Sequence, residues 1–377
     1  MKRPSVIALL IAALATASVL LVAPNPGSAK PVPRAPATFF GIGPQAPVSG
    51  EDLEYMKAGG IGSMRVLVPW AAIQPTAKGG YEWGGMDVTV EEASRKGMRL
   101  LPFVYGTPRW LSRDERRLPV DSGRQRTAWT NFLKALVGRY GPGGAFWTEH
   151  APGVVNYQSE AINRPQPIRD WQIWNEVNFF YFAFPVSVPR YARLINISGP
   201  AIKSVDPGAN VILSGLFGEP KPKGNKGMFA SKFLEQLYKY PGIKSRFDSV
   251  ALHPYAVDAE SLEEMVEELH EVTVENRDRP GLYITELGWG SQNNYEEVAF
   301  EQGPRGQATQ LRDSYRYMIE NRGRLNLKAA YWFSWKDLKD SCTFCDSVGF
   351  FHEGKKYRPK PAWHTFVSIT RGTARPR

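Results

Sequence analysis

The sequence predicts one α/β domain, a (β/α)8 TIM barrel in which eight parallel strands alternate with helices. Three observations support this prediction. Short runs rich in Val, Ile and Leu alternate with longer helix-like stretches eight times along the chain. Residues 39–377 are close to the usual size of an elaborated barrel. No Pro- or Ser-rich linker divides them, so we expect a single catalytic domain.

The predicted strands are apolar runs bounded by Gly, Pro and polar residues. They are Phe39–Gly43, Ser63–Pro69, Arg99–Gly106, Asp170–Glu176, Asn210–Leu216, Ser249–Tyr255, Leu282–Leu287 and Leu327–Trp335. The predicted helices are Gly50–Ala58, Met86–Lys96, Thr127–Tyr140, Val188–Val205, Phe229–Tyr240, Ala259–Asn276, Gly306–Arg322 and Pro361–Thr370. A doubly wound open sheet is the alternative. It is disfavoured because the first strand ends in Gly41-Ile42-Gly43-Pro44, which lacks the third glycine of a phosphate loop.

The N-terminal segment 1–29 has the pattern of a signal peptide: a basic start, an apolar run over 6–23, and small residues up to Ala29. An uncleaved membrane anchor is the alternative, because the apolar run is about as long as the shortest membrane-spanning helix. Both alternatives place the barrel outside the cytoplasm, secreted or held at the cell surface. Residues 30–38, which contain three prolines, are expected to form an extended lead-in.

The two cysteines, Cys342 and Cys345, are three residues apart. In an oxidising compartment we expect them to form a local disulfide bond. A redox-active Cys-x-x-Cys site is the weaker interpretation, since no strand-to-helix opening of the thioredoxin kind surrounds them. Two cysteines alone cannot make a structural zinc site, and we expect neither a metal nor a cofactor.

Charge gives a clue to partners. The chain carries a formal charge of +10, and removal of Lys2 and Arg3 with the signal segment leaves +8. Basic residues gather in the segments Arg109–Arg126 and Lys221–Lys232. These residues form either a solvated rim or a cleft for an acidic glycan. No recognition motif for nucleic acid accompanies the charge, so a nucleic-acid partner is not expected.

Two apolar, aromatic-rich runs end in a glutamate. Trp171–Asn178 contains Glu176, and Leu282–Trp289 contains Glu286. A carboxylate at the end of a buried strand is costly without partners, so each glutamate is expected to have a function. In a barrel, both lie at the C-terminal ends of strands four and seven, where catalytic residues are found. Two carboxylates facing one another across a gap are what glycoside hydrolysis requires.

These motifs resemble the retaining β/α-barrel glycosidases of glycoside hydrolase clan A, most closely family 39 and the related family 5. The resemblance is carried by Trp171-Gln-Ile-Trp-Asn-Glu-Val-Asn, His253-Pro-Tyr255 and Tyr283-Ile-Thr-Glu-Leu-Gly-Trp289, and it covers residues from about 39 to 370. One departure is Val177, which stands where proline is frequent in these enzymes. The aromatic run Phe179–Phe182 follows it, so the substrate cannot be carried over.

The resemblance implies a role for individual residues. Glu176 corresponds to the general acid/base and Glu286 to the nucleophile. Five further substrate-site positions follow: Asn175 on the sugar 2-hydroxyl, Arg65 supporting the nucleophile, His253 and Tyr255 lining the pocket, and Trp332 or Trp335 as a stacking floor. Trp289, beside the nucleophile, is a further candidate for stacking on a sugar.

The division of roles also follows from chemistry alone. A retaining enzyme needs one protonated and one ionised carboxyl group at the same pH. We expect Glu286 to be ionised, with Arg65 and the Tyr255 hydroxyl as donors, and Glu176 to hold a proton for the leaving group. The predicted function is therefore a retaining O-glycosyl hydrolase acting on a poly- or oligosaccharide. The alternative is a non-catalytic carbohydrate-binding barrel.

Overall fold

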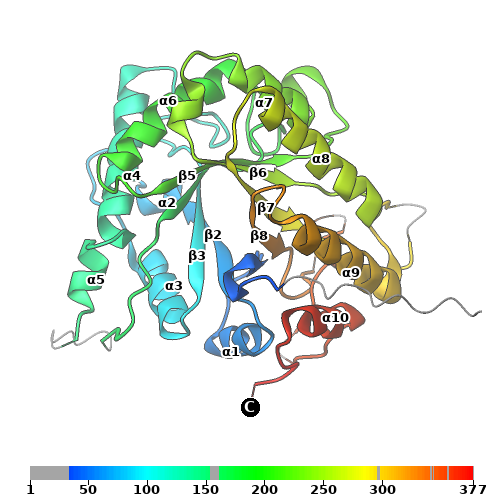
Figure 1. Ribbon diagram of the computed structural model, residues 1–377. Coiled ribbons are helices and arrows are strands. Elements are labelled where there is room, and N and C mark those ends of the chain that lie inside the picture. The colour runs from blue at the N-terminus through cyan, green and yellow to red at the C-terminus, as the bar shows by residue number, and fades with distance from the viewer. Residues whose placement is uncertain are drawn as a thin grey trace, which may run out of the picture. The chain divides into compact units, whose positions relative to one another are not determined.

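The computed structural model describes residues 34–152, 161–294, 298–339, 342, 344–354 and 356–376. The predicted signal segment and residues 30–33 of the lead-in lie outside these residues. Eight parallel strands form a closed barrel in chain order, and β1 pairs with both β2 and β8 (Figure 1). The predicted TIM-barrel fold is confirmed.

The strands lie close to their predicted bounds. They are β1 (Phe40–Ile42), β2 (Ser63–Pro69), β3 (Arg99–Tyr105), β4 (Asp170–Ile173), β5 (Asn210–Phe217), β6 (Ser249–His253), β7 (Gly281–Leu287) and β8 (Leu327–Trp332). The ends of β4, β6 and β8 fall short of the prediction by two or three residues. At these ends the chain leaves the sheet to build the mouth of the barrel.

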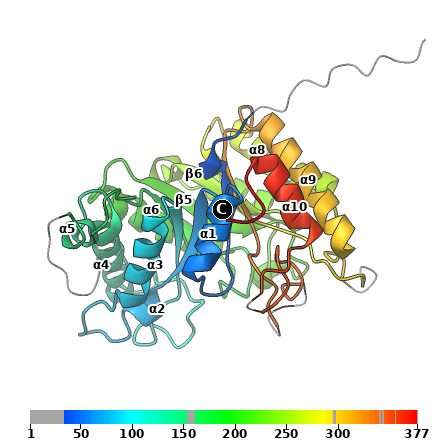
Figure 2. The same cartoon turned by 90° about the horizontal axis from the view of Figure 1, so that it is seen from below.

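Helices follow the strands and cover the outside of the barrel (Figures 1 and 2). They are α1 (Gly50–Ala58), α2 (Trp70–Ile73), α3 (Gly84–Arg95), α4 (Gly123–Tyr140), α5 (Ala145–Glu149), α6 (Val188–Lys203), α7 (Ala230–Tyr238), α8 (Ala259–Glu275), α9 (Gly303–Asn321) and α10 (Pro361–Thr370). Helix α4 begins before the predicted Thr127 because Ser122 and Gln125 form a reciprocal cap at its start. None of the described helices combines the length and the apolar character needed to span a bilayer.

The barrel interior is filled by side chains from alternate positions of its strands. Leu101, Ile212, Ala251, Tyr283, Ala329 and Tyr331 form one buried cluster. Gly41 on β1 makes room for this cluster, since a Cβ atom there would lie 2.2 Å from the Tyr331 ring. Because inward-facing residues recur at every second position, the next inward residues toward the C-terminal ends line the mouth.

The predicted disulfide bond joins Cys342 and Cys345 in the segment after β8, with Cα atoms 4.9 Å apart. Closure of so short a loop restrains this segment locally.

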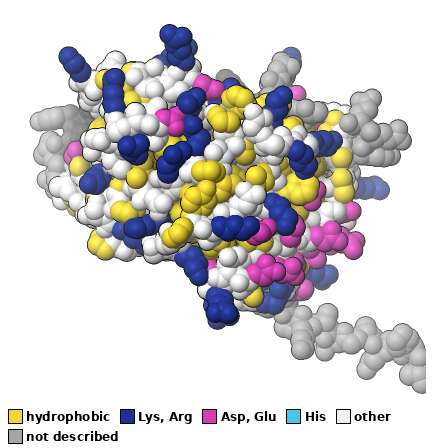
Figure 3. All heavy atoms as spheres, turned by 90° about the horizontal axis from the view of Figure 1, so that it is seen from above, with side chains coloured by type: hydrophobic (Ala, Val, Ile, Leu, Met, Phe, Trp, Pro, Cys, Tyr) yellow, Lys and Arg dark blue, Asp and Glu magenta, His cyan; other side chains and the backbone are white. Residues whose placement is uncertain are grey.

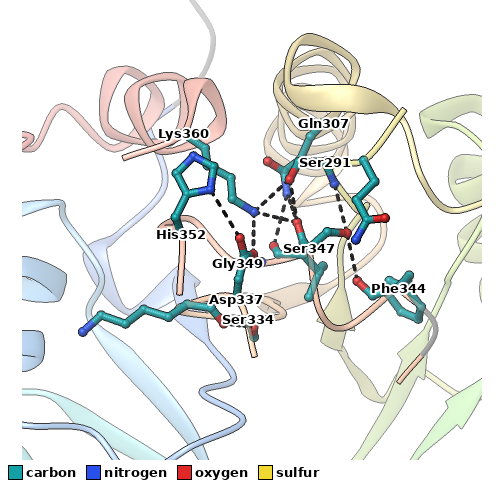
Figure 4. Close-up of polar contacts among 12 residues, drawn as sticks. Ser291, Gln307, Ser334, Asp337, Phe344, Ser347, Gly349, His352 and Lys360 are labelled. Atoms are coloured by element: carbon teal, nitrogen blue, oxygen red, sulfur yellow. Dashed lines mark hydrogen bonds and ion pairs between the residues drawn. The ribbon is translucent and has the colours of Figure 1, made fainter. Parts of the chain in front are cut away.

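The segments after β7 and β8 are held together by a buried lysine. Lys360 reaches from the start of α10 to Asp337, Ser347 and Ser291 (Figure 4). Its Nζ atom lies 2.5 Å from Asp337 Oδ1, 2.6 Å from the Ser347 carbonyl oxygen and 2.9 Å from Ser291 Oγ. Glu301, fully buried nearby, accepts from the Gln292 N–H at 2.6 Å and from the Ser347 hydroxyl at 2.5 Å. The ammonium group and this carboxylate thus fix two loops at the mouth.

Candidate active site

An irregular turn places Glu176 at the mouth. Strand β4 ends at Ile173, and the next residues include two in left-handed backbone conformation, Trp174 with φ 75° and Glu176 with φ 38°. Asn175, between them, pairs with Gly215 of β5. Such conformations cost of order 1–3 kcal/mol each for residues with side chains and persist only where the surrounding structure holds them. The turn lets Asn175 and Glu176 both reach the mouth of the barrel.

Arg65 of β2 is the central donor of the site. Its Nη1 lies 2.6 Å from Glu286 Oε1, its Nη2 lies 2.6 Å from Asn175 Oδ1, and its Nε lies 2.8 Å from Gln172 Oε1. The guanidinium carbon is 4.0 Å from the centre of the Phe103 ring, which supports it from the side. One buried cation therefore positions residues from β4 and β7 together.

Glu286 receives two donors. Besides Arg65, the Tyr255 hydroxyl donates to its second oxygen, Oε2, at 2.8 Å. Burial raises the pKa of Tyr255 well above its ordinary value, and the neighbouring Glu286 charge adds to this effect. Tyr255 therefore stays protonated and able to donate. Both oxygens of the Glu286 carboxyl group thus accept a hydrogen bond, one from a guanidinium and one from a phenol.

Glu176 lies in the opposite electrostatic environment. Its side chain is 6% exposed, and burial raises its pKa well above the ordinary glutamate range, with the Glu286 charge as a second cause. Its Oε1 lies 2.7 Å from Nδ1 of His253. Burial, followed by the Arg65 charge, holds the pKa of His253 well below its usual range, so this contact is a hydrogen bond with a neutral imidazole. Burial therefore favours the protonated form of Glu176, whereas Glu286 has a donor on each of its two oxygens.

The histidine is oriented by a chain of hydrogen bonds. Gln172 uses its carbonyl oxygen for Arg65, so its Nε2 faces Thr285 Oγ1 at 3.2 Å. Thr285 Oγ1 in turn lies 2.9 Å from Nε2 of His253. The Thr285 hydroxyl can then donate a hydrogen bond to Nε2 of His253. The proton of the imidazole is then on Nδ1, which donates to Glu176. This tautomer leaves the proton of Glu176 on its other oxygen, where a substrate could receive it.

Gly215 leaves the space that the histidine occupies. A Cβ atom at this position would lie 2.0 Å from His253 Nε2 and 2.6 Å from Thr285 Oγ1. The space also explains why a strand with a strong β-forming sequence has a glycine near its end.

Glu176, His253 and Glu286 each place one oxygen or nitrogen atom so that all three lie within 4.8 Å of one another. Such a set could in principle hold a metal ion. Arg65 already supplies a positive charge at 2.6 Å from Glu286, however, and would repel a cation placed there. The arrangement therefore fits two carboxyl groups that act on a substrate between them.

The structure thus brings together six of the residues singled out from sequence: Arg65, Asn175, Glu176, His253, Tyr255 and Glu286. It does not bring the three tryptophans to them. Trp289, Trp332 and Trp335 are 1%, 0% and 3% exposed, and their indole N–H groups donate to Ala256 O, Val348 O and Asp52 Oδ1. All three rings are buried in this structure, and their predicted role in stacking on a sugar stays a prediction.

One of the partly exposed aromatic rings near the site belongs to Phe333, and Phe344 and Phe300 also lie near Tyr255. The Phe333 ring lies 6.3 Å, edge to face, from the ring of Tyr255. Strand alternation could have identified it, because Tyr331 faces into the barrel and Phe333 follows two positions later, whereas Trp332 faces the helices. Gln172 and Thr285 were also missed, and alternation from Tyr283 identifies Thr285 in the same way.

No protein-family model matches the chain, and no curated protein matches it. The fold is similar to that of solved structures. One is a family 39 glycoside hydrolase from Bacteroides cellulosilyticus WH2, with 18% identity, 88% of this chain and 63% of that chain covered, and a TM-score of 0.62. Another is a monomeric beta-xylosidase from Caulobacter crescentus CB15, with 16% identity, 89% and 68% covered, and a TM-score of 0.62.

A third is a GH5_18 structure from Bifidobacterium longum subsp. infantis, with 14% identity, 85% and 72% covered, and a TM-score of 0.58. This chain therefore spans about two thirds of the length of the first two, 63% and 68%. At these identities the likeness establishes the fold. The barrel is shared with glycoside hydrolases of families 39 and 5, as the sequence motifs predicted.

Proposed function

We propose that this protein is an exported, retaining glycoside hydrolase that cleaves a poly- or oligosaccharide. The observation that carries the proposal is the unequal pair of carboxyl groups. Burial favours the protonated form of Glu176, while Arg65 and Tyr255 donate to Glu286, and the two groups approach within 4.8 Å. Retaining glycosidases have carboxyl groups about 5–5.5 Å apart, and inverting enzymes have them about 6.5–9.5 Å apart.

The reaction proceeds in two displacements. An oxygen of Glu286 attacks the anomeric carbon while the glycosidic C–O bond breaks, and the Glu176 proton moves to the departing oxygen. Water then attacks the same carbon, gives one proton to Glu176 and releases Glu286. Asn175, fixed by Arg65, is placed to contact the sugar beside the reacting carbon, and such contacts strengthen as positive charge develops there.

Export is supported by two features of the chain. The segment 1–29 has the pattern of a signal peptide, and Cys342 and Cys345 are joined in a disulfide bond. Disulfide bonds form and persist mainly in oxidising compartments. We therefore propose that the barrel acts outside the cytoplasm, on glycans of the cell surface or the surroundings.

The test is a screen of the purified protein against aryl glycosides and defined polysaccharides, followed by trapping with the 2-fluoro analogue of an accepted sugar. Peptide mass spectrometry should place the label on Glu286. Glu219→Gln is a matched control, because Glu219 is an exposed glutamate directly after β5, at the same end of the barrel. Label on another carboxylate, or glycan binding without any turnover, would contradict the proposal and favour a non-catalytic binding barrel.

A further inference from the structure

Three loops at the mouth are tied into one wall beside Glu176. The first is the part of the loop after β4 that continues from Glu176. It is hydrogen-bonded to the loop after β3, because Nη1 of Arg116 donates to the carbonyl oxygen of Phe180 at 3.3 Å. The Phe180 N–H donates to the carbonyl oxygen of Lys226, in the loop after β5, at 3.0 Å. Asn178, fully buried, donates to the carbonyl oxygens of Phe217 and Met228 at 2.6 and 2.8 Å. The wall is therefore built from fixed contacts.

An aromatic row leads from the carboxylates along this wall. The ring of Tyr255, which donates to Glu286, lies 5.9 Å from the ring of Phe217, and Phe217 stacks on Phe179 at 5.0 Å. Phe179 contacts Tyr181 at 5.0 Å, and Phe180 stacks on Tyr181 at 4.3 Å. Tyr181 is 61% exposed. The row thus begins buried at the reacting centre and ends in solvent, where sugar rings could stack on it.

The two basic segments beside this row differ in how far their charge is balanced. Figure 3 shows one face of the molecule, on which Lys and Arg side chains are spread widely and Asp and Glu side chains gather mainly toward one side. In the loop after β3, Arg116 and Arg117 pair with Asp114 and Asp121 of the same loop, at 2.8 and 2.9 Å. This basic segment is therefore partly neutralised.

The loop after β5 is different. Lys221, Lys223 and Lys226 are exposed, and within the described residues none of them has an acidic side chain at ion-pair distance. Lys223 instead lies 3.1 Å above the centre of the Phe229 ring. The loop after β4, from 177 to 187, contains no charged residue, and Glu219 is the only acidic residue between β5 and α7. Like charges kept together without counter-charges favour an anionic partner.

We propose that Phe180, Tyr181 and these three lysines form a binding surface for the leaving-group side of an anionic glycan, one that carries carboxylate or sulfate groups. The direction rests on the proposed function: Glu176 protonates the departing oxygen, so the departing part of the chain lies against the loop that continues from Glu176. The choice of an anionic glycan rests on the lysines and does not need turnover.

The experiment measures affinity by titration calorimetry at low and high salt, with three polymers of matched length: a polyuronate, a sulfated glycan and a neutral polysaccharide. The test variant changes Lys221, Lys223 and Lys226 to Gln. The control changes Lys57, Lys244 and Lys328 to Gln, because these exposed residues lie at helix ends and strand starts on the opposite end of the barrel. Both variants remove three positive charges, so the net charge is the same.

We expect the test variant to weaken binding of at least one acidic polymer about tenfold at low salt, and less at high salt, because exposed ion pairs are screened. The control should leave that affinity unchanged. Tyr181→Ala should weaken binding about three- to tenfold at either salt concentration, since stacking is not screened. The polyuronate and sulfated arms tell the two anions apart.

Equal effects of the test and control variants would overturn the proposal, as would tight binding of the neutral polymer that neither variant changes. The outcome that would contradict the proposed function is a different one. If the acidic polymer binds through the lysines but is never cut by the wild-type protein, the binding surface stands and the hydrolase assignment falls. If the polymer is cut equally well by the test variant and the wild type, with unchanged affinity, the hydrolase stands and the binding surface falls.

Discussion

Two of the buried pairs of a cation and a carboxylate in the described part of the chain differ in what faces them. Lys360 and Asp337 are surrounded by groups of the protein: the Ser347 carbonyl oxygen and Ser291 hydroxyl accept from the lysine, and the Gly349 N–H donates to the carboxylate. Arg65 and Glu286 face a second carboxyl group, Glu176. A buried ion pair alone therefore does not indicate catalysis. A second carboxyl group beside the pair, in a different environment, is the feature that favours an acid/base function.

Replacing each cation by an apolar residue should separate the two pairs most strongly. Lys360→Met leaves Asp337 buried without its partner and should lower the free energy of unfolding by about 3–5 kcal/mol, while turnover by the folded protein persists. Arg65→Met should instead lower kcat/KM by about 10²–10³-fold, because Glu286 and Asn175 lose their common donor. Urea unfolding and steady-state kinetics on both variants measure this contrast. Equal losses of activity in the two variants would contradict the difference between the two ion pairs.

Glu176→Gln should reveal what the second carboxyl group contributes. Without a transferable proton, cleavage of substrates with poor leaving groups should slow by about 10²-fold or more, while the first step with activated aryl leaving groups is spared. Because the second step also loses its base, added azide should restore turnover and give a glycosyl azide of retained configuration. Unchanged rates on an unactivated substrate would assign the acid role to another residue.

The same substitution should change how stability depends on pH. The pKa of Glu176 is raised in the folded protein, so the stabilisation from its proton is present below about pH 4.3, the ordinary glutamate value, and is lost as pH rises through the raised value. Glu176→Gln is neutral at every pH. Between about pH 4.3 and the raised pKa, the free energy of unfolding of this variant relative to wild type should therefore grow by up to about 1.4 kcal/mol per pH unit. Urea unfolding from pH 4 to 7 measures it, and Glu219→Gln, at an exposed site, should show no such growth.

Thr285→Val should have the smallest effect. The substitution removes the hydroxyl that is hydrogen-bonded to Nε2 of His253 and keeps the side-chain volume. We expect kcat on unactivated substrates to fall about two- to tenfold, the range of one hydrogen bond, with KM unchanged. Thr285→Ser should restore it. A fall that serine does not rescue would mean that the threonine acts only through packing.

The sequence predicted the barrel well because period and breakers are local signals. Each strand was placed within three residues, and helices such as Gly50–Ala58 and Pro361–Thr370 match their predicted bounds. The helices α2 and α5 were not predicted, since four and five residues are too few to show a helical period. Glu176, Glu286 and Arg65 were singled out because charge at the end of an apolar strand is conspicuous, and the structure brings the three side chains together.

The site was harder to predict where local signals compete with tertiary packing. Tryptophan is a frequent partner of sugars, and this made Trp332 and Trp335 attractive, but both rings are buried in this structure. Phe333, which was not singled out from the sequence, lies beside Tyr255. The pairing of Gln172 with Thr285 joins residues 113 positions apart, and no pattern along the chain reports such a contact before the barrel closes.

Closure of the barrel has a consequence for how such proteins diversify. The gap between the carboxyl groups depends on the circumference of eight paired strands, because Glu176 and Glu286 are positioned by the ends of β4 and β7 and by Arg65 between them. The aromatic and basic loops are added outside that ring. Under the proposed function, insertions and substitutions in the loops can therefore redirect the molecule to a new glycan while the stereochemical course of bond cleavage is inherited unchanged.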